Sequence, residues 1–147
     1  MPGAESLKKG QYYGLSRNQF WSIVFKVLNE APRAGYAEKK ALLRENRIAL
    51  WDVAGACRRE GSSDSSIRQV RPNDIPRLIR RYKNIRTIFL NGKKAEALYR
   101  RYFGKIIRIP AYSLPSTSPA YAAMSFERKL NAWNAVKPYL QNRNPWC

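Results

Sequence analysis

The 147-residue sequence lacks histidine entirely, carries two cysteines and has only 10 acidic residues. The absence of histidine removes the commonest general base and metal ligand, so any chemistry must use amides, carboxylates, hydroxyls or lysine. Cys57 and Cys147 have no spacing typical of a metal site or a disulfide framework, which predicts reduced thiols, no metal and a cytoplasmic location. No apolar run reaches the roughly 20 residues of a membrane span, and the first ten residues lack the apolar core of a signal peptide.

Basic residues, in contrast, are abundant: 28 Lys and Arg give a formal net charge of +18. An excess of this size favours polyanionic partners, and we expect nucleic acid rather than a membrane. A generically basic surface without such a partner is the alternative. The hydrophobic fraction of 44% argues against disorder, and the length fits one domain over residues 1–147 with its own core.

Apolar periodicity predicts helices that alternate with short strands. Caps place three helices: one begins after Ser16, one after Asn73 or Asp74, and one after Ser125. Further expectations are helices over 36–46 and 93–103, strands over 48–53, 85–92 and 106–115, and a polar loop in the Gly/Ser-rich stretch that starts at Cys57. This alternation predicts an α/β protein, a three-layer α/β/α sandwich around a short, mainly parallel sheet.

The carboxyl ends of parallel strands form the ligand-binding edge of such a sheet. Loops follow the predicted strands after Asp52, over 91–95 and over 114–122, and the segment 10–18 is expected to join them. The last of these loops combines hydroxyl donors with a rigid backbone, a combination suited to DNA phosphates, in Ser116, Thr117, Ser118 and Pro119. An ordinary turn is an equally good interpretation of those residues alone.

Other stretches give weaker signals. Ser63 and Asp64 lie among serines, where Asp64 could act as a base but where an aspartate more often forms a turn. Lys93 follows a glycine in "NGKKA", which lacks the spacing of a phosphate loop and fits a turn that caps a helix. Arginine and tyrosine mix over 77–83 and 99–105, which suits either nucleic-acid contacts or the solvated faces of helices.

The order of the motifs is more specific than any one of them. The chain carries, in this order, "MPGAESL", "GQYYGLSRNQFW", "IALWDVAGACRREGSSDSSI", "NDI", "IFLNGKKA" and "LPSTSPA". This arrangement resembles the uracil-DNA glycosylase superfamily, and most closely its hypoxanthine-DNA glycosylase branch. The mismatch-specific uracil and thymine glycosylases are similar in their proline-glycine turn, their Asn-x-Phe-Trp ending and their late Leu-Pro-x-x-Ser loop.

The resemblance implies a DNA repair glycosylase that flips a deaminated base, hypoxanthine first and uracil second, out of double- or single-stranded DNA. It implies a monomeric, monofunctional enzyme that hydrolyses the N-glycosidic bond without a cofactor or metal. By the same resemblance, Asn18 is the catalytic residue, whose amide orients water or the leaving base. Tyr13 matches the aromatic on which the base stacks, while Gly10 and Gly14 let the backbone bend around it.

The resemblance also assigns DNA binding to Ser116, Thr117, Ser118, Pro119, Tyr121 and Lys93. Residues 121–124 would form a wedge that enters the gap left by the flipped base. No pocket that would lower the pKa of Lys93 or Lys94 is indicated, so a Schiff base and a lyase activity are not expected.

Three departures qualify this reading. Leu15 and Ser16 replace the family's His-Pro, and Tyr121 replaces an asparagine of the late motif. The apolar strand that precedes the proline-glycine turn in the relatives is expected to be absent, because the chain starts at Met1. These departures favour, as the alternative function, a non-catalytic basic nucleic-acid-binding domain on the same fold. A poorly folding, inactive fragment is the third hypothesis.

Overall fold

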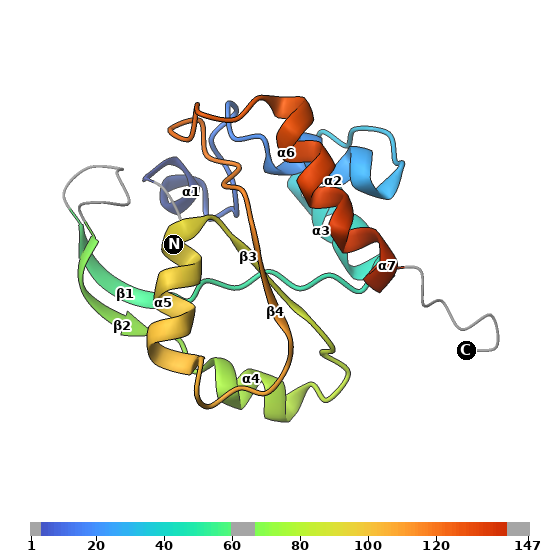
Figure 1. Cartoon of the computed structure of the whole chain (residues 1–147). Helices are drawn as coiled ribbons and strands as arrows, with labels where there is room; N and C mark the ends of the chain where they lie inside the picture. The colour runs from blue at the N-terminus through green and yellow to red at the C-terminus, as the bar shows by residue number, and fades with distance from the viewer. Residues whose placement is uncertain (1–3, 60–66, 141–147) are drawn as a thin grey trace.

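Helices flank a small parallel sheet in the computed structural model, which describes residues 4–59 and 67–140 (Figure 1). In chain order the elements are α1 (Ala4–Lys9), α2 (Phe20–Leu28), α3 (Tyr36–Glu45), β1 (Ala54–Arg59), β2 (Ile67–Pro72), α4 (Ile75–Arg81), β3 (Ile88–Asn91), α5 (Lys93–Phe103), β4 (Ala111–Leu114), α6 (Phe126–Trp133), a 3-10 helix (Asn134–Val136) and α7 (Lys137–Leu140). Among the described helices, none is long and apolar enough to cross a membrane.

Strands β3 and β4 pair in parallel, as the alternation of strands and helices predicts. Their register pairs Ile88 with Ala111 and Asn91 with Leu114, so both strands end at the same edge. The connection between them contains α5, which lies beside the sheet in Figure 1. The loops expected to form the site therefore leave the sheet together.

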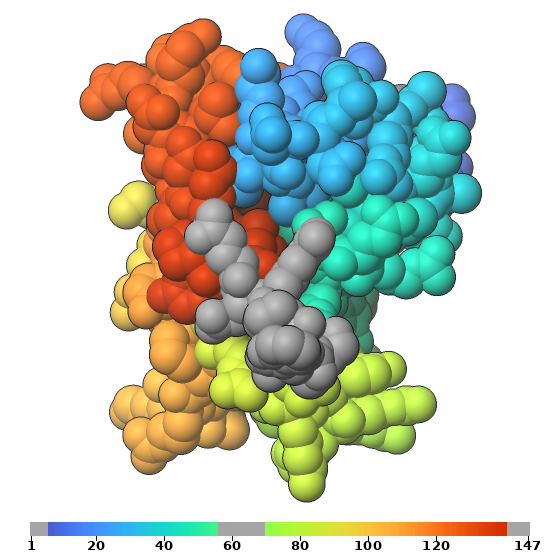
Figure 2. Space-filling view, turned by 90° about the vertical axis from the view of Figure 1, so that its right-hand side faces the viewer, coloured from blue at the N-terminus to red at the C-terminus, as the bar shows by residue number. Residues whose placement is uncertain are grey.

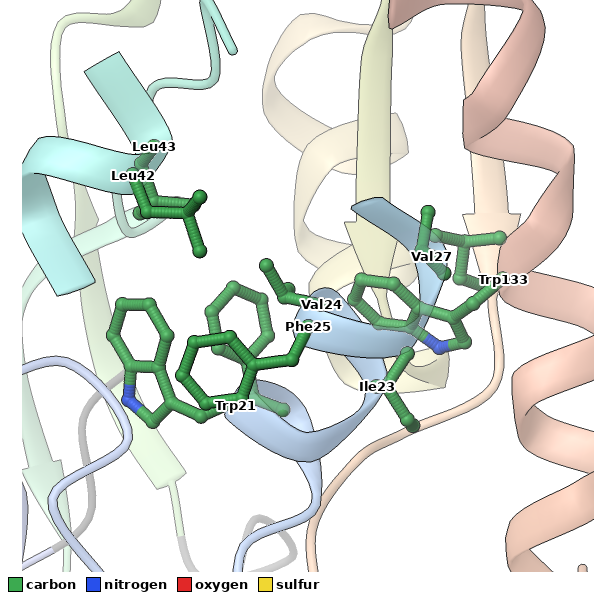
Figure 3. Packing of buried hydrophobic residues seen from close by; sticks show 10 residues of the cluster. Trp21, Ile23, Val24, Phe25, Val27, Leu42, Leu43 and Trp133 are labelled. Atoms are coloured by element: carbon green, nitrogen blue, oxygen red, sulfur yellow. The ribbon is translucent and has the colours of Figure 1, made fainter. Parts of the chain in front are cut away.

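Apolar side chains pack against both faces of this sheet, which confirms the α/β sandwich. Successive residues of a strand point to opposite faces, and Leu90 packs with Tyr99 and Phe103 of α5. Phe89 and Leu114 join a larger cluster built from α2, α3 and α6. Figure 2 shows the surface of α2 and α3 beside that of α6 and α7. Besides Phe20 and Leu114, the buried members of the larger cluster are the residues labelled in Figure 3: Trp21, Ile23, Val24, Phe25, Val27, Leu42, Leu43 and Trp133.

Side-chain caps fix the starts of α4 and α6 where the sequence places them. The Asp74 carboxylate accepts a hydrogen bond from the backbone N–H of Arg77 (2.9 Å). The Ser125 hydroxyl accepts one from the backbone N–H of Arg128 (3.3 Å). Both caps satisfy an N–H group that has no partner inside the helix, so they are readable from local sequence.

The predicted cap at Ser16 is wrong. Helix α2 begins only at Phe20, and its N-cap position is Gln19, which makes no side-chain capping bond. The Asn18 side chain satisfies the first helical N–H instead, because its Oδ1 accepts a hydrogen bond from Phe20 N (3.0 Å). An asparagine bonded to a backbone N–H two residues on is a favoured local turn.

The predicted strand over 48–53 is also wrong. Within the described residues this segment pairs with no strand, and Asn73 binds its backbone through bonds to Asp52 O (2.8 Å) and Val53 O (2.9 Å). Ile48 and Leu50 still pack against the larger cluster, which accounts for the apolar pattern without a ladder. Described parts of the expected polar loop lie in strands instead, because β1 pairs antiparallel with β2.

Candidate active site

Asn91, the last residue of β3, joins three segments at the carboxyl edge of the sheet. Its Nδ2 donates to the Tyr13 hydroxyl (2.9 Å) and to Thr117 Oγ1 (2.9 Å), while its Oδ1 accepts from Thr117 N (3.0 Å). Both amide protons and the oxygen are therefore used. The expected meeting of segment 10–18 with the loops at 91–95 and 114–122 is confirmed, and Asn91 is the residue that holds them.

Gly92 lets the end of β3 approach the late loop, residues 114–124, closely. Its φ of +93° and ψ of 163° lie in a region that is almost restricted to glycine. A Cβ at this position would lie 2.9 Å from Ser116 Cβ, and the Gly92 N–H donates to Leu114 O (2.9 Å). The glycine is therefore required by both backbone conformation and space.

Tyr13 is held in a strained conformation at the centre of this network. Its φ of 54° is left-handed, which is uncommon for a bulky residue. Its ring stacks on Phe20, with centroids 3.9 Å apart and planes at 17°. Burial raises the pKa of its hydroxyl to about 12, so the phenol is neutral near neutral pH. The side chain offers a fixed, uncharged aromatic surface.

Asn18 lies at the start of α2 with one half of its amide engaged. Its backbone N–H donates to Leu15 O (2.9 Å), and Oδ1 accepts from the N–H of Phe20. The Phe20 N–H requires an acceptor, which fixes the orientation of the amide. Among the described residues no group binds Asn18 Nδ2. The side chain therefore has a hydrogen-bond donor available for another molecule.

The glycines of the opening segment have different roles. Gly10 ends α1 with a φ of +60°, and a Cβ there would meet nothing within 4 Å. The Gly14 N–H donates to Ser6 Oγ (2.9 Å), and its carbonyl accepts from Lys9 Nζ (3.1 Å). Helix α1 thus fastens the backbone around Tyr13.

Tyr12 connects the site to Asp52, the position after which the first of the predicted loops begins. Burial, followed by the negative charge of Asp52, raises the pKa of Tyr12 to about 12. The Tyr12 carbonyl accepts from Trp21 Nε1 (3.2 Å), and its N–H donates to the Tyr36 hydroxyl (3.1 Å). Asp52 therefore lies close to Tyr12, and no role for its side chain was predicted from the sequence.

The late loop holds its own shape through hydroxyl groups. Ser116 Oγ accepts from the N–H of Ser118 (3.2 Å), and Ser118 Oγ accepts from that of Ala120 (3.3 Å). Each serine hydroxyl keeps its own proton as a donor, and both side chains are half-buried. Thr117 has no exposed surface and binds Asn91, so its side chain supports the loop and is not open to phosphate. Half-buried Pro119 completes the turn.

Lys129 of α6 makes polar contacts that were not predicted from the sequence. It is 2% exposed, and its Nζ donates to Gln19 Oε1 (3.0 Å) and to the Tyr121 carbonyl (2.8 Å). Burial lowers the pKa of its ammonium group. The available signal was its spacing of three and four residues from Phe126 and Trp133, which places it on the apolar stripe of the helix.

The remaining predicted residues either lie at the edge of the site or fall outside the residues that the structure describes. Lys93 is exposed at the first position of α5, and Tyr121 is 36% exposed in the late loop. Ser63 and Asp64 lie outside the described residues. Within residues 4–59 and 67–140, no three Cys, Asp or Glu side chains come together in a group that could hold a metal ion.

Comparison with known proteins places this geometry in a family, although no family model matches the chain. A hypoxanthine DNA glycosylase from Methanosarcina acetivorans is 37% identical over 140 residues, which cover 92% of this chain and 85% of that protein. Another from Methanosarcina barkeri is 34% identical over 96 residues, which cover 65% of this chain and 61% of that protein.

A solved structure is similar to this chain in both fold and sequence. The solution NMR structure of a Methanosarcina acetivorans protein, assigned as a uracil DNA glycosylase, matches with a TM-score of 0.81 at 37% identity. The match covers 95% of this chain and 85% of that one. Because sequence and fold agree along most of both chains, this chain belongs to the hypoxanthine DNA glycosylase family within the uracil-DNA glycosylase superfamily.

Proposed function

We propose that the protein releases deaminated bases from DNA, hypoxanthine before uracil, by hydrolysing the N-glycosidic bond of a flipped nucleotide. As a member of its family it is a DNA glycosylase, an enzyme of DNA repair. The observation that carries the proposal is the network at Asn91, which places Tyr13 and the late loop at one edge of the sheet, next to Asn18.

The flipped base would extend an aromatic stack that already exists. Tyr13 lies flat against Phe20, so its ring is fixed before any ligand arrives. A rigid ring loses little conformational entropy on binding, and every base has a π-face that such a ring can cover. The raised pKa of Tyr13 keeps the phenol uncharged, which suits a neutral heterocycle.

Catalysis would rest on the amide of Asn18. An amide is too weak a base to take a proton from water, but its Nδ2 can donate a hydrogen bond to the base as negative charge develops on it. A donor fixed in advance is worth more than one that must reorganise, because no free energy is spent on reorganisation at the moment of reaction. The bond between Oδ1 and Phe20 N provides that fixation.

The late loop and Lys93 would hold the DNA strand. The Ser116 and Ser118 hydroxyls can donate to phosphate oxygens, and the positive charge of Lys93 adds an electrostatic contact. Residues 121–124 would fill the gap in the duplex, and these contacts must offset the few kcal/mol that unstacking costs. We propose that the enzyme acts as a monomer in the cytoplasm, a placement that rests on its cysteine content.

A base-release assay tests the proposal. Labelled duplexes with a single hypoxanthine, uracil or xanthine are incubated with the protein, treated with alkali and resolved on a denaturing gel. We expect breakage only after alkali, fastest for hypoxanthine, and its loss in Asn18→Ala, which should still bind the DNA. Full activity of Asn18→Ala would overturn the catalytic assignment. No breakage by a wild-type protein that melts cooperatively would favour the non-catalytic binding domain.

A further inference from the structure

Lys129 is a buried cation placed between the two parts of the proposed site. Its ammonium lies 3.0 Å from Gln19 Oε1, beside Asn18, and 2.8 Å from the carbonyl of Tyr121, in the second half of the late loop. It also lies 5.3 Å from the centre of the Tyr121 ring, over its face. In the part of the chain that the structure describes, no carboxylate forms an ion pair with it.

A buried ammonium group without an ion-pair partner is unfavourable for folding, so its presence here needs an explanation. Burying a charge without an opposite charge is unfavourable unless hydrogen bonds compensate. The apolar stripe of α6 also contains Phe126, Leu130 and Trp133, so an apolar side chain at position 129 would fit the core. Packing therefore does not explain a lysine at this position. An apolar side chain could not reproduce its two hydrogen bonds, which join Gln19 to Tyr121.

Two further hydrogen bonds connect the late loop to the start of α2 and to α6. Gln19 N donates to Thr117 O (3.0 Å), and Trp133 Nε1 donates to Pro115 O (3.0 Å). The first half of the late loop is thus fixed by these bonds and by Asn91. Its second half, which contains the exposed residues 121–123, is connected to the start of α2 through Lys129.

We propose that Lys129 is a positioning residue that holds the DNA-inserting half of the late loop at a fixed place relative to Asn18. The proposal rests on the proposed function, because it concerns how that site couples base extrusion to bond cleavage. The loop must keep the gap closed against the returning base while Asn18 acts on the flipped nucleotide. A displacement of about 1 Å between such groups can lower a rate on the order of a hundredfold.

This role predicts a dependence on how firmly the damaged base is stacked. A paired hypoxanthine must be extruded and kept out, whereas one inside a three-nucleotide bubble is already unpaired and costs less to flip. Lys129→Met should therefore slow single-turnover release from the paired duplex at least tenfold more than release from the bubble. Lys83→Met is the matched control, since it removes the same charge from an exposed lysine that precedes β3, at the end of the strand away from the site.

Extrusion can be followed without cleavage. An aminopurine placed opposite the lesion becomes fluorescent when it unstacks, and we expect Lys129→Met to reduce this increase at least threefold while Lys83→Met does not. The double variant Gln19→Leu/Lys129→Met removes both side chains of this hydrogen bond, so it guards against misfolding caused by an unsatisfied Gln19 amide. Thermal melting of each variant shows which of them are folded.

Each outcome decides the proposal. A smaller fluorescence increase and a changed paired-to-bubble ratio, in whichever of the two variants melts cooperatively, support it. If that variant shows the fluorescence increase of the wild-type protein and loses release rate equally on both substrates, Lys129 has only a structural role. If the wild-type protein extrudes but never cleaves, the proposed function fails, and the fluorescence comparison still decides the role of Lys129. A wild-type protein that does neither overturns both.

Discussion

Asn91 and Thr117 bind each other through two hydrogen bonds, from Nδ2 to Oγ1 at 2.9 Å and from the Thr117 N–H to Oδ1 at 3.0 Å. The pair fixes the carboxyl end of β3 to the late loop. Because Thr117 is completely buried, neither of its groups can turn to water when the partner is removed. The contact should therefore control both the stability of the domain and the geometry of its site.

Asn91→Ala should lower the free energy of unfolding by about 1–3 kcal/mol, because it leaves buried groups of Thr117 without partners. Asn91→Asp should cost less, since its carboxylate still accepts from the Thr117 N–H and the hydroxyls of Tyr13 and Thr117 can rotate to donate. Chemical unfolding of the two variants checks the order. An alanine variant as stable as wild type would contradict the structural role of Asn91.

Gly92→Ala should destabilise the protein by about 1–3 kcal/mol through its backbone conformation alone, with a further loss from contact with Ser116. Gly10→Ala separates the two causes, because Gly10 also has a positive φ but has open space around it. We expect Gly10→Ala to cost about 1–2 kcal/mol, the price of a left-handed residue. Equal melting temperatures for the two variants would contradict the close approach at Ser116.

Asn18→Asp should separate activity from stability. The new carboxylate keeps the oxygen that accepts from Phe20 N, and a negative charge at the start of a helix is favourable, so stability should be retained. The variant loses the donor Nδ2 and places a negative charge near the leaving base, which should lower single-turnover release on the order of a hundredfold or more. Thermal melting and release rates check the two parts. An active Asn18→Asp would contradict the donor role.

Stability should decrease at alkaline pH through Tyr12 and Tyr13. Both pKa values are raised from 10.0 to about 12, chiefly by burial, so above pH 10 the unfolded chain loses these protons before the folded one. The resulting stabilisation is complete below pH 10 and is lost as the pH rises through about 12. The free energy of unfolding, measured across this pH window with tyrosinate absorbance as the probe, should decline less steeply in Tyr13→Phe than in wild type. Tyr82→Phe, which removes a hydroxyl from a 52% exposed ring, is the matched control.

DNA affinity should fall steeply with salt, and Lys93 should account for part of that dependence. If Lys93 binds one phosphate, Lys93→Met lowers the slope of log affinity against log salt by about 0.9. Lys83→Met, which removes a charge at the opposite end of β3, should leave the slope unchanged. Fluorescence anisotropy over a salt series measures both. Equal slopes for wild type and Lys93→Met would remove Lys93 from the DNA contact.

Features set by neighbouring residues were predictable from the sequence. Asp74 and Ser125 cap their helices, and α5 spans 93–103, because each depends on residues within a few positions. The strand over 48–53 failed because a strand also needs a partner, and apolar spacing cannot show whether one is present. The same limit concealed the pairing of β1 with β2, in which Arg58 lies opposite Arg68 and the sequences of the two strands lack regular apolar alternation.

The same difference between local and long-range contacts decides which residues of the site could be predicted. Tyr13 and Asn18 were placed by resemblance, and their meeting with the late loop followed from the expected sheet edge. Asn91 and Lys129 were missed, since their roles exist only through distant partners. A strand-ending asparagine before glycine and a lysine on an apolar helical stripe are the local signs that such residues leave.

The hydrogen bonds of the site connect parts of the chain that are far apart in sequence. The Tyr13–Asn91 bond spans 78 residues and the Gln19–Lys129 bond spans 110. Closing loops of this size costs entropy before any contact repays it, which delays their formation during folding. We therefore expect glycosylase activity to return only in the last phase of refolding. During synthesis, we expect the chain to be inactive on DNA until residue 129 has left the ribosome.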